Sequence, residues 1–92
     1  MIKSFRHKGL EDFFYNNSKK GICPEHAKKL ARILDRLHAA EDLKDMNYPD
    51  SGLHQLRGDK EGQYAVRVSG NWRLFFEFLE GRTYVVDYDD YH

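Results

Sequence analysis

The sequence predicts an α+β domain in which two N-terminal helices pack on one face of a small, twisted and mainly antiparallel β-sheet. Apolar and polar residues alternate between residues 63 and 78, which is typical of strands that bury one face. Upstream, apolar residues recur with helical spacing between residues 10 and 38. A chain of 92 residues holds one domain with a modest core, so we assign residues 1–92 to a single domain.

The helices follow a short N-terminal segment, residues 1–5, which is expected to form an edge strand or a first strand. Leu10, Phe13 and Phe14 fall on one stripe of the first helix. Pro24 suits the first position of the second helix. The apolar stripe of that helix contains Ala27, Leu30, Ala31, Leu34, Leu37 and His38. Its opposite face is basic, and it is either a solvated surface or a contact for an acidic partner or an RNA backbone.

The alternating stretch is predicted to fold as a hairpin whose register follows from parity. Only a loop with an odd number of residues leaves the apolar sides of both strands on one face. The loop Ser69-Gly70-Asn71 meets that condition, with glycine or asparagine in the left-handed conformation. The resulting pairs are Val68 with Trp72, Val66 with Leu74, and Arg67 with Arg73.

Two further strands complete the predicted sheet. Residues 53–57 form one of them, but their apolar residues are spaced irregularly, so His54 faces either the core or the arginine side. Residues 83–88 form the last strand. The apolar face of that strand is expected to contain Tyr84, Val86 and Tyr88. The same parity rule places Asp89 opposite Arg73.

The arginine pair of the hairpin requires an explanation. When Arg67 and Arg73 face each other at about 6 Å, with an effective dielectric constant near 20, Coulomb's law gives a repulsion of about 3 kcal/mol. Acidic residues of the C-terminal segment neutralise the pair, or the two guanidiniums together hold an anion such as phosphate. The spacing alone leaves both explanations open.

Composition limits the remaining functional classes. The chain has 15 basic and 15 acidic residues, so a nucleic-acid site must be a local concentration of positive charge. Such a concentration occurs in the hairpin region, at Arg57, Lys60, Arg67 and Arg73. A single cysteine cannot form an internal disulfide, and no apolar run reaches membrane-spanning length, so we expect a cytoplasmic protein.

Chemical motifs narrow the candidate site further. The sequence contains no paired cysteines, no HExxH motif and no phosphate-binding glycine loop, and Cys23 with His26 forms only an isolated CxxH spacing. We therefore expect no metal ion and no other cofactor. His54 and His92 are the candidates for proton transfer, because both are expected near the arginine pair and imidazole titrates near neutral pH.

Three stretches together resemble the HigB branch of the RelE/ParE toxin superfamily, the toxins of bacterial toxin-antitoxin modules. They are residues 53–59 (LHQLRGD), residues 64–73 (YAVRVSGNWR) and the terminal Asp90-Tyr91-His92. The resemblance covers essentially the whole chain. It implies a RelE-like fold and a ribosome-dependent ribonuclease that cuts mRNA without a metal ion. It also implies inhibition by a helix-turn-helix antitoxin of the HigA type, which represses the shared operon.

The resemblance gives the basic residues their expected roles. Arg67 and Arg73 would stabilise the phosphoryl oxygens while the RNA 2′-hydroxyl attacks the adjacent phosphate. Arg57 departs from the lysine of many relatives, and a guanidinium pKa is too high for a general base. Arg57 is therefore expected, with Lys60, only to bind phosphate.

The remaining candidates lie near the chain's end or on the preceding strand. His92, with His54 as its rival, would serve as acid or base, and Tyr91 would stack on or orient a nucleotide. Asp90 would either orient His92 or pair with Arg73.

Two other functions remain open at the level of sequence. Gyrase poisons of the ParE type have nearly the same fold, and fold does not decide function. A non-catalytic module would use its basic face only to bind RNA or an acidic protein segment. The terminal Asp90-Tyr91-His92 beside paired arginines favours the nuclease.

Overall fold

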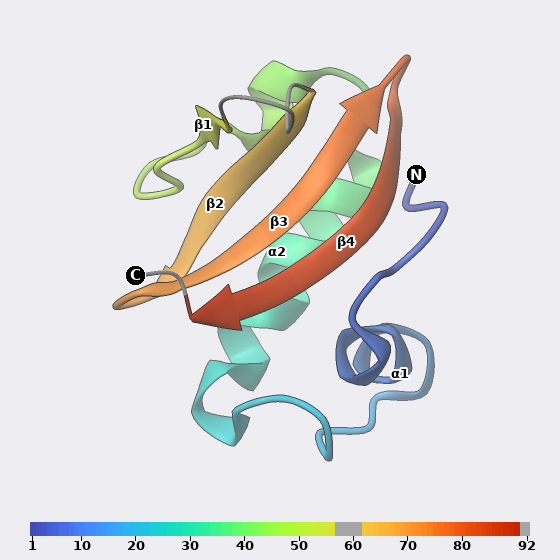
Figure 1. Ribbon diagram of the computed structural model, residues 1–92, viewed down its shortest axis with the longest axis vertical. Helices are drawn as coiled ribbons and strands as arrows, with labels where there is room; N and C mark the ends of the chain where they lie inside the picture. The colour runs from blue at the N-terminus through green and yellow to red at the C-terminus, as the bar shows by residue number, and fades with distance from the viewer. Residues whose placement is uncertain (57–61, 91–92) are drawn as a thin grey trace.

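The computed structural model describes residues 1–56 and 62–90, and it confirms the predicted α+β class. Four strands form one antiparallel sheet in the order β1-β2-β3-β4 (Figure 1). Their bounds are β1 His54–Gln55, β2 Gln63–Ser69, β3 Trp72–Leu79 and β4 Arg82–Asp90. The helical elements precede the sheet in the chain, and they are α1 Lys8–Asn16, η1 Pro24–His26, α2 Ala27–Ala39 and η2 Leu43–Met46.

The helices cover one face of the sheet, and α2 crosses behind it in the view of Figure 1. Leu30, Leu34 and Leu37 recur at helical spacing along α2 and are almost fully buried. They belong to the same apolar cluster as Val66 and Leu74 from the central strands. The hydrophobic core therefore lies between the helical layer and this sheet face, and the opposite sheet face carries the arginine pair.

The hairpin register agrees with the prediction except beside the turn. Val66 pairs with Leu74, and Arg67 pairs with Arg73, as predicted. The predicted pair of Val68 with Trp72 is wrong, because Ser69 lies opposite Trp72 and the register shifts between Arg67 and Ser69. A β-bulge, and not a three-residue loop, therefore keeps the apolar sides of both strands on one face. Val68 still points into the core.

A second bulge changes the outward face of β4. Phe75 pairs with Asp87 and Glu77 pairs with Tyr84, so two β4 residues oppose the single residue between Phe75 and Glu77. Val85 is one of the two, and its φ of 48° lies in the left-handed region. Beyond the bulge the strand faces are exchanged. Val86 and Tyr88 are buried as predicted, but Thr83 is buried in place of Tyr84.

The N-terminal segment lies along the outer edge of β4. Ile2 forms an isolated parallel bridge with Thr83, and Phe5 forms another with Val86. The backbone N–H of Arg6 also donates to the Val86 carbonyl at 2.8 Å. The expected edge strand is therefore reduced to two bridges. No helix of the described residues is long and apolar enough to cross a membrane.

Candidate active site

The predicted arginine pair lies in a row that crosses the sheet. Residues paired across neighbouring strands share one sheet face. Arg67 of β2 pairs with Arg73 of β3, which in turn pairs with Asp89 of β4. Arg67 and Asp89 are exposed, and Arg73 is partly buried. Two guanidiniums and one carboxylate therefore occupy one row on the face that the helices leave open.

The Arg73 guanidinium binds the hairpin turn. Its Nη1 donates to the carbonyl oxygens of Gly70 at 2.6 Å and of Trp72 at 3.0 Å. The register opposite Asp89 is as predicted, yet among the described residues no ion pair joins Asp89 to Arg73. The bonds to the two carbonyls orient the guanidinium without neutralising it, so the arrangement can accept an external anion.

A second row on the same face settles the orientation of His54. His54 pairs with Ala65, Ala65 with Phe75, and Phe75 with Asp87. Since Ala65 lies between Tyr64 and Val66 of the core side, its partner His54 faces the arginine side. The His54 ring is exposed, and its Nδ1 lies 3.1 Å from the Gly52 carbonyl oxygen.

Sequence reasoning places Phe75 on the same side of its strand as Arg73 but does not include it among the site residues. Its ring lies in the row next to the arginines, and it is partly buried. An aromatic ring beside cationic groups is a common platform for a nucleotide base. The available signal was the position of Phe75 among the outward residues of an alternating strand.

The other predicted site residues fall at or beyond the limits of the described chain. Asp90 aligns with Trp72, one position past the arginine row, so its side chain leaves the strand on the opposite face from Arg73. Asp89 is the residue that lies opposite Arg73 in the register. Outside the described residues lie Arg57, Lys60, Tyr91 and His92.

A cluster of rings lies directly behind the arginine row, on the core side. Tyr88 packs against Trp72 with ring centroids 4.8 Å apart, and His26 lies 5.4 Å from Trp72. The Tyr88 hydroxyl forms a hydrogen bond with Nδ1 of His26. Burial raises the pKa of the Tyr88 hydroxyl well above its usual range, and a hydrogen bond with the Cys23 side chain adds to the shift.

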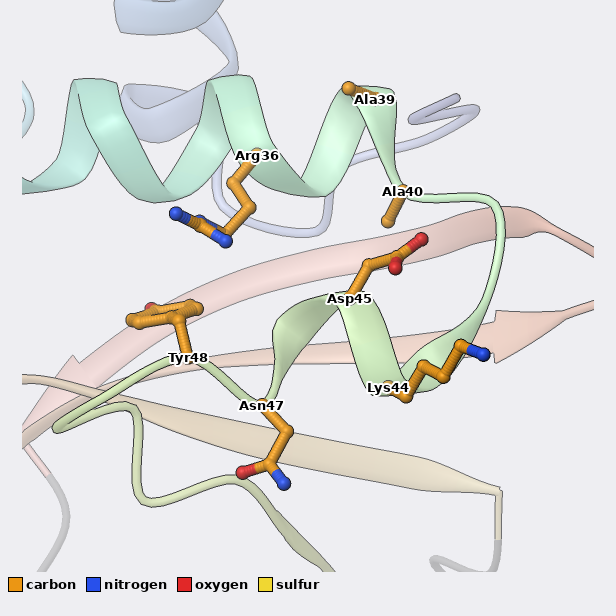
Figure 2. Close-up of a pocket in the computed structure, with 7 residues that line it drawn as sticks. All are labelled: Arg36, Ala39, Ala40, Lys44, Asp45, Asn47 and Tyr48. Atoms are coloured by element: carbon orange, nitrogen blue, oxygen red, sulfur yellow. The ribbon is translucent and has the colours of Figure 1, made fainter.

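The helical side carries a groove between α2 and η2 (Figure 2). It has a volume of about 430 Å³ and adjoins a second cavity of about 250 Å³. Arg36 and Tyr48 line both cavities. The guanidinium carbon of Arg36 lies 4.7 Å from the centroid of the Tyr48 ring. The rest of the lining comprises Lys29, Arg32, Ile33, Ala39, Ala40, Lys44, Asp45 and Asn47. We call this surface the α2 groove.

The charge of the α2 groove is mainly positive. Lys29, Arg32 and Arg36 lie at helical spacing on one ridge of α2. The carboxylate of Asp45 accepts hydrogen bonds from the backbone N–H groups of Glu41 and Asp42, each at 3.1 Å. Across all of the described residues, no group of three His, Cys, Asp or Glu side chains could hold a metal ion.

The sequence places this fold in a known class of protein. The chain belongs to the family of RelE-like toxins of the type II toxin-antitoxin system HigB, whose sequence profile matches residues 3–92. The resemblance seen in the sequence is thereby confirmed. Membership in a type II module implies that the protein has an antitoxin partner.

Individual relatives agree with this assignment. The chain is 41% identical to the endoribonuclease HigB of Proteus vulgaris, over the full length of both proteins. It is 29% identical to the toxin HigB-1 of Vibrio cholerae serotype O1 across 88% of this chain and 87% of that one. An uncharacterised protein of Haemophilus influenzae is 32% identical over 80% of this chain and 75% of its own length.

Proposed function

We propose that this toxin is a ribosome-dependent endoribonuclease that cuts mRNA in the cytoplasm and so inhibits translation and growth. The observation that carries the proposal is the row of Arg67 and Arg73 on the open sheet face. The Proteus vulgaris relative, which is named an endoribonuclease, supports the same activity. Two adjacent guanidiniums suit the non-bridging oxygens of a phosphodiester.

The reaction that fits this site needs no cofactor. The RNA 2′-oxygen attacks the adjacent phosphorus, a bond forms between them, and the bond from phosphorus to the 5′-oxygen breaks. A base removes the proton of the 2′-hydroxyl, and an acid protonates the departing 5′-oxygen. The products are a 2′,3′-cyclic phosphate and a 5′-hydroxyl. Arg67 and Arg73 stabilise the charge that develops on the phosphoryl oxygens.

The proton transfers are assigned to the histidines of the site. His92 is the first candidate for acid or base, and His54 is its rival because it faces the arginine side from β1. Asp90 orients His92 in this proposal. Tyr91 stacks on a nucleotide, a role for which Phe75 is a second platform. Arg57 and Lys60 bind flanking phosphates.

The proposed partners are the ribosome with its mRNA and a helix-turn-helix antitoxin of the HigA type. On the helical layer, the α2 groove has the chemistry to receive an acidic, amphipathic segment of the antitoxin. The basic ridge of Lys29, Arg32 and Arg36 attracts carboxylates, while Ile33 and Tyr48 offer apolar contacts. An RNA backbone would use the charges of the groove but not its apolar floor.

Primer extension on a defined mRNA, with and without ribosomes, tests the proposed activity. Cuts within codons should appear only when ribosomes are present, and Arg73→Ala should abolish them. Arg82→Ala is the matched control, because Arg82 is an exposed arginine at the opposite end of the sheet. Cleavage that persists in Arg73→Ala overturns the site. DNA breaks with intact mRNA would instead identify a gyrase poison.

A further inference from the structure

Tyr88 is the last buried side chain among the described residues. It is 3% exposed, whereas Asp89 and Asp90 are both exposed. Tyr91 and His92, the proposed catalytic end of the chain, follow directly in the sequence. Tyr88 therefore makes the last buried side-chain contacts of β4 within the described chain, and backbone pairing with β3 continues beyond it to Asp90.

The attachment joins β4 to the start of the helical layer. The Tyr88 hydroxyl bonds to Nδ1 of His26, which closes η1 immediately before α2 and is 7% exposed. The Tyr88 ring also lies against His7, with centroids 5.5 Å apart, and against Trp72. Trp72 adjoins Arg73 in the chain and accepts a hydrogen bond from its guanidinium. One ring cluster thus joins β3 and β4, the strands of Arg73 and Asp89.

The Tyr88 hydroxyl keeps its proton, because burial raises the pKa of this group above its ordinary value. The contact with His26 therefore involves an uncharged phenol and acts as a fixed attachment.

We propose that His26 and Tyr88 are positioning residues of the nuclease, which attach the C-terminal end of β4 to the helical layer. The attachment keeps Asp89 beside Arg73 and holds the end of β4, which Tyr91 and His92 follow in the sequence. This inference rests on the proposed ribonuclease activity. It assigns a role to a buried pair that does not face the RNA-binding side.

Tyr88→Phe tests the inference because it removes the hydroxyl and keeps the ring. We expect kcat for mRNA cleavage on ribosomes to fall about ten- to a hundredfold at unchanged KM, since a small displacement of catalytic groups has an effect of this size. Thr83→Val is the matched control in the same strand. The Thr83 hydroxyl is also buried but has no hydrogen-bond partner within the described chain, so its removal should leave kcat unchanged.

A double-variant cycle and an NMR measurement separate positioning from loss of stability. His26→Phe should lower kcat like Tyr88→Phe, and the double variant should be no worse than either. Amide signals of Asp89, Asp90 and the two terminal residues should shift in Tyr88→Phe but not in Thr83→Val. Unchanged kcat, or unchanged amide signals, would overturn the inference. If the wild-type protein cleaves no RNA, the proposed function fails, and the NMR comparison still decides whether the bond fixes the strand end.

Discussion

Arg67 and Arg73 lie directly opposite each other in β2 and β3, although like charges at paired positions destabilise a sheet. The guanidinium of Arg73 is directed to the carbonyls of the hairpin turn. The free protein therefore keeps an electrostatic cost at the place where a phosphate would remove it. A site of this kind trades stability for function.

Arg67→Gln should separate these two effects. The substitution removes the repulsion, so we expect the free energy of unfolding to increase by as much as about 1 kcal/mol. The cleavage rate should fall by about a hundredfold, because one contact to the phosphoryl oxygens is lost. Urea unfolding and primer extension on the same preparation measure both quantities. A variant that is less stable than the wild type would contradict the unfavourable pairing.

Gly9 is predicted to be intolerant of any side chain. A Cβ atom at Gly9 would lie 2.5 Å from the carbonyl oxygen of Gly21, so the backbone itself would have to move. At a helical position with free space, replacing glycine by alanine normally increases the free energy of unfolding by about 1 kcal/mol. Here we expect Gly9→Ala to reduce the free energy of unfolding by about 1–3 kcal/mol. The control is Lys8→Ala at the neighbouring exposed position, and equal thermal midpoints would refute the close contact.

The β4 bulge yields a substitution that should stabilise the protein. Val85 has a positive φ, which costs a β-branched residue about 1–2 kcal/mol, and its side chain is 36% exposed. Val85→Gly should therefore raise the thermal midpoint or leave it unchanged. Val86→Gly, at the buried neighbour, should lower stability by about 2 kcal/mol or more. Equal destabilisation by both substitutions would contradict the placement of the bulge at Val85.

The buried tyrosines predict how stability depends on alkaline pH. Burial raises the pKa of both Tyr48 and Tyr88 above the ordinary value of 10.0, although the charge of Arg36 partly opposes the shift at Tyr48. Their folded forms hold the proton more tightly than the unfolded chain does. The resulting stability is complete below pH 10 and is lost as the pH rises through the folded pKa. Urea unfolding between about pH 8 and pH 11 should show this loss, with a shallower decline in Tyr48→Phe/Tyr88→Phe.

Charge reversal in the α2 groove tests the antitoxin contact. We expect Arg32→Glu/Arg36→Glu to weaken binding of the module's antitoxin by about ten- to a hundredfold in titration calorimetry. Lys19→Glu/Lys20→Glu makes the same change of charge at exposed positions outside the groove and should have little effect. Unchanged antitoxin affinity, together with loss of ribosome binding, would show that RNA occupies the groove.

The sequence was sufficient for the features that depend on alternation and helical spacing. Val66 with Leu74, Arg67 with Arg73, and Arg73 with Asp89 all follow from parity along short strands. The stripe of α2 likewise placed Leu30, Leu34 and Leu37 in the core.

The errors came from irregular positions, where the period-two pattern stops. A bulge at Val85 costs one unfavourable φ, and tertiary contacts with the N-terminal segment stabilise it, including a hydrogen bond from the Val85 N–H to Ser4 Oγ. Such contacts are remote in sequence, so local patterns could not reveal that Thr83 replaces Tyr84 in the core. The orientation of His54 needed the β1 register for the same reason.

The bridges of Ile2 and Phe5 also protect the sheet from self-association. A strand edge with unsatisfied backbone groups is a template on which another chain can add a strand. Residues 1–6 supply backbone partners to Thr83 and Val86 along the outer edge of β4. Without this segment, the outer edge of β4 would leave backbone groups open to pairing with a strand of another copy.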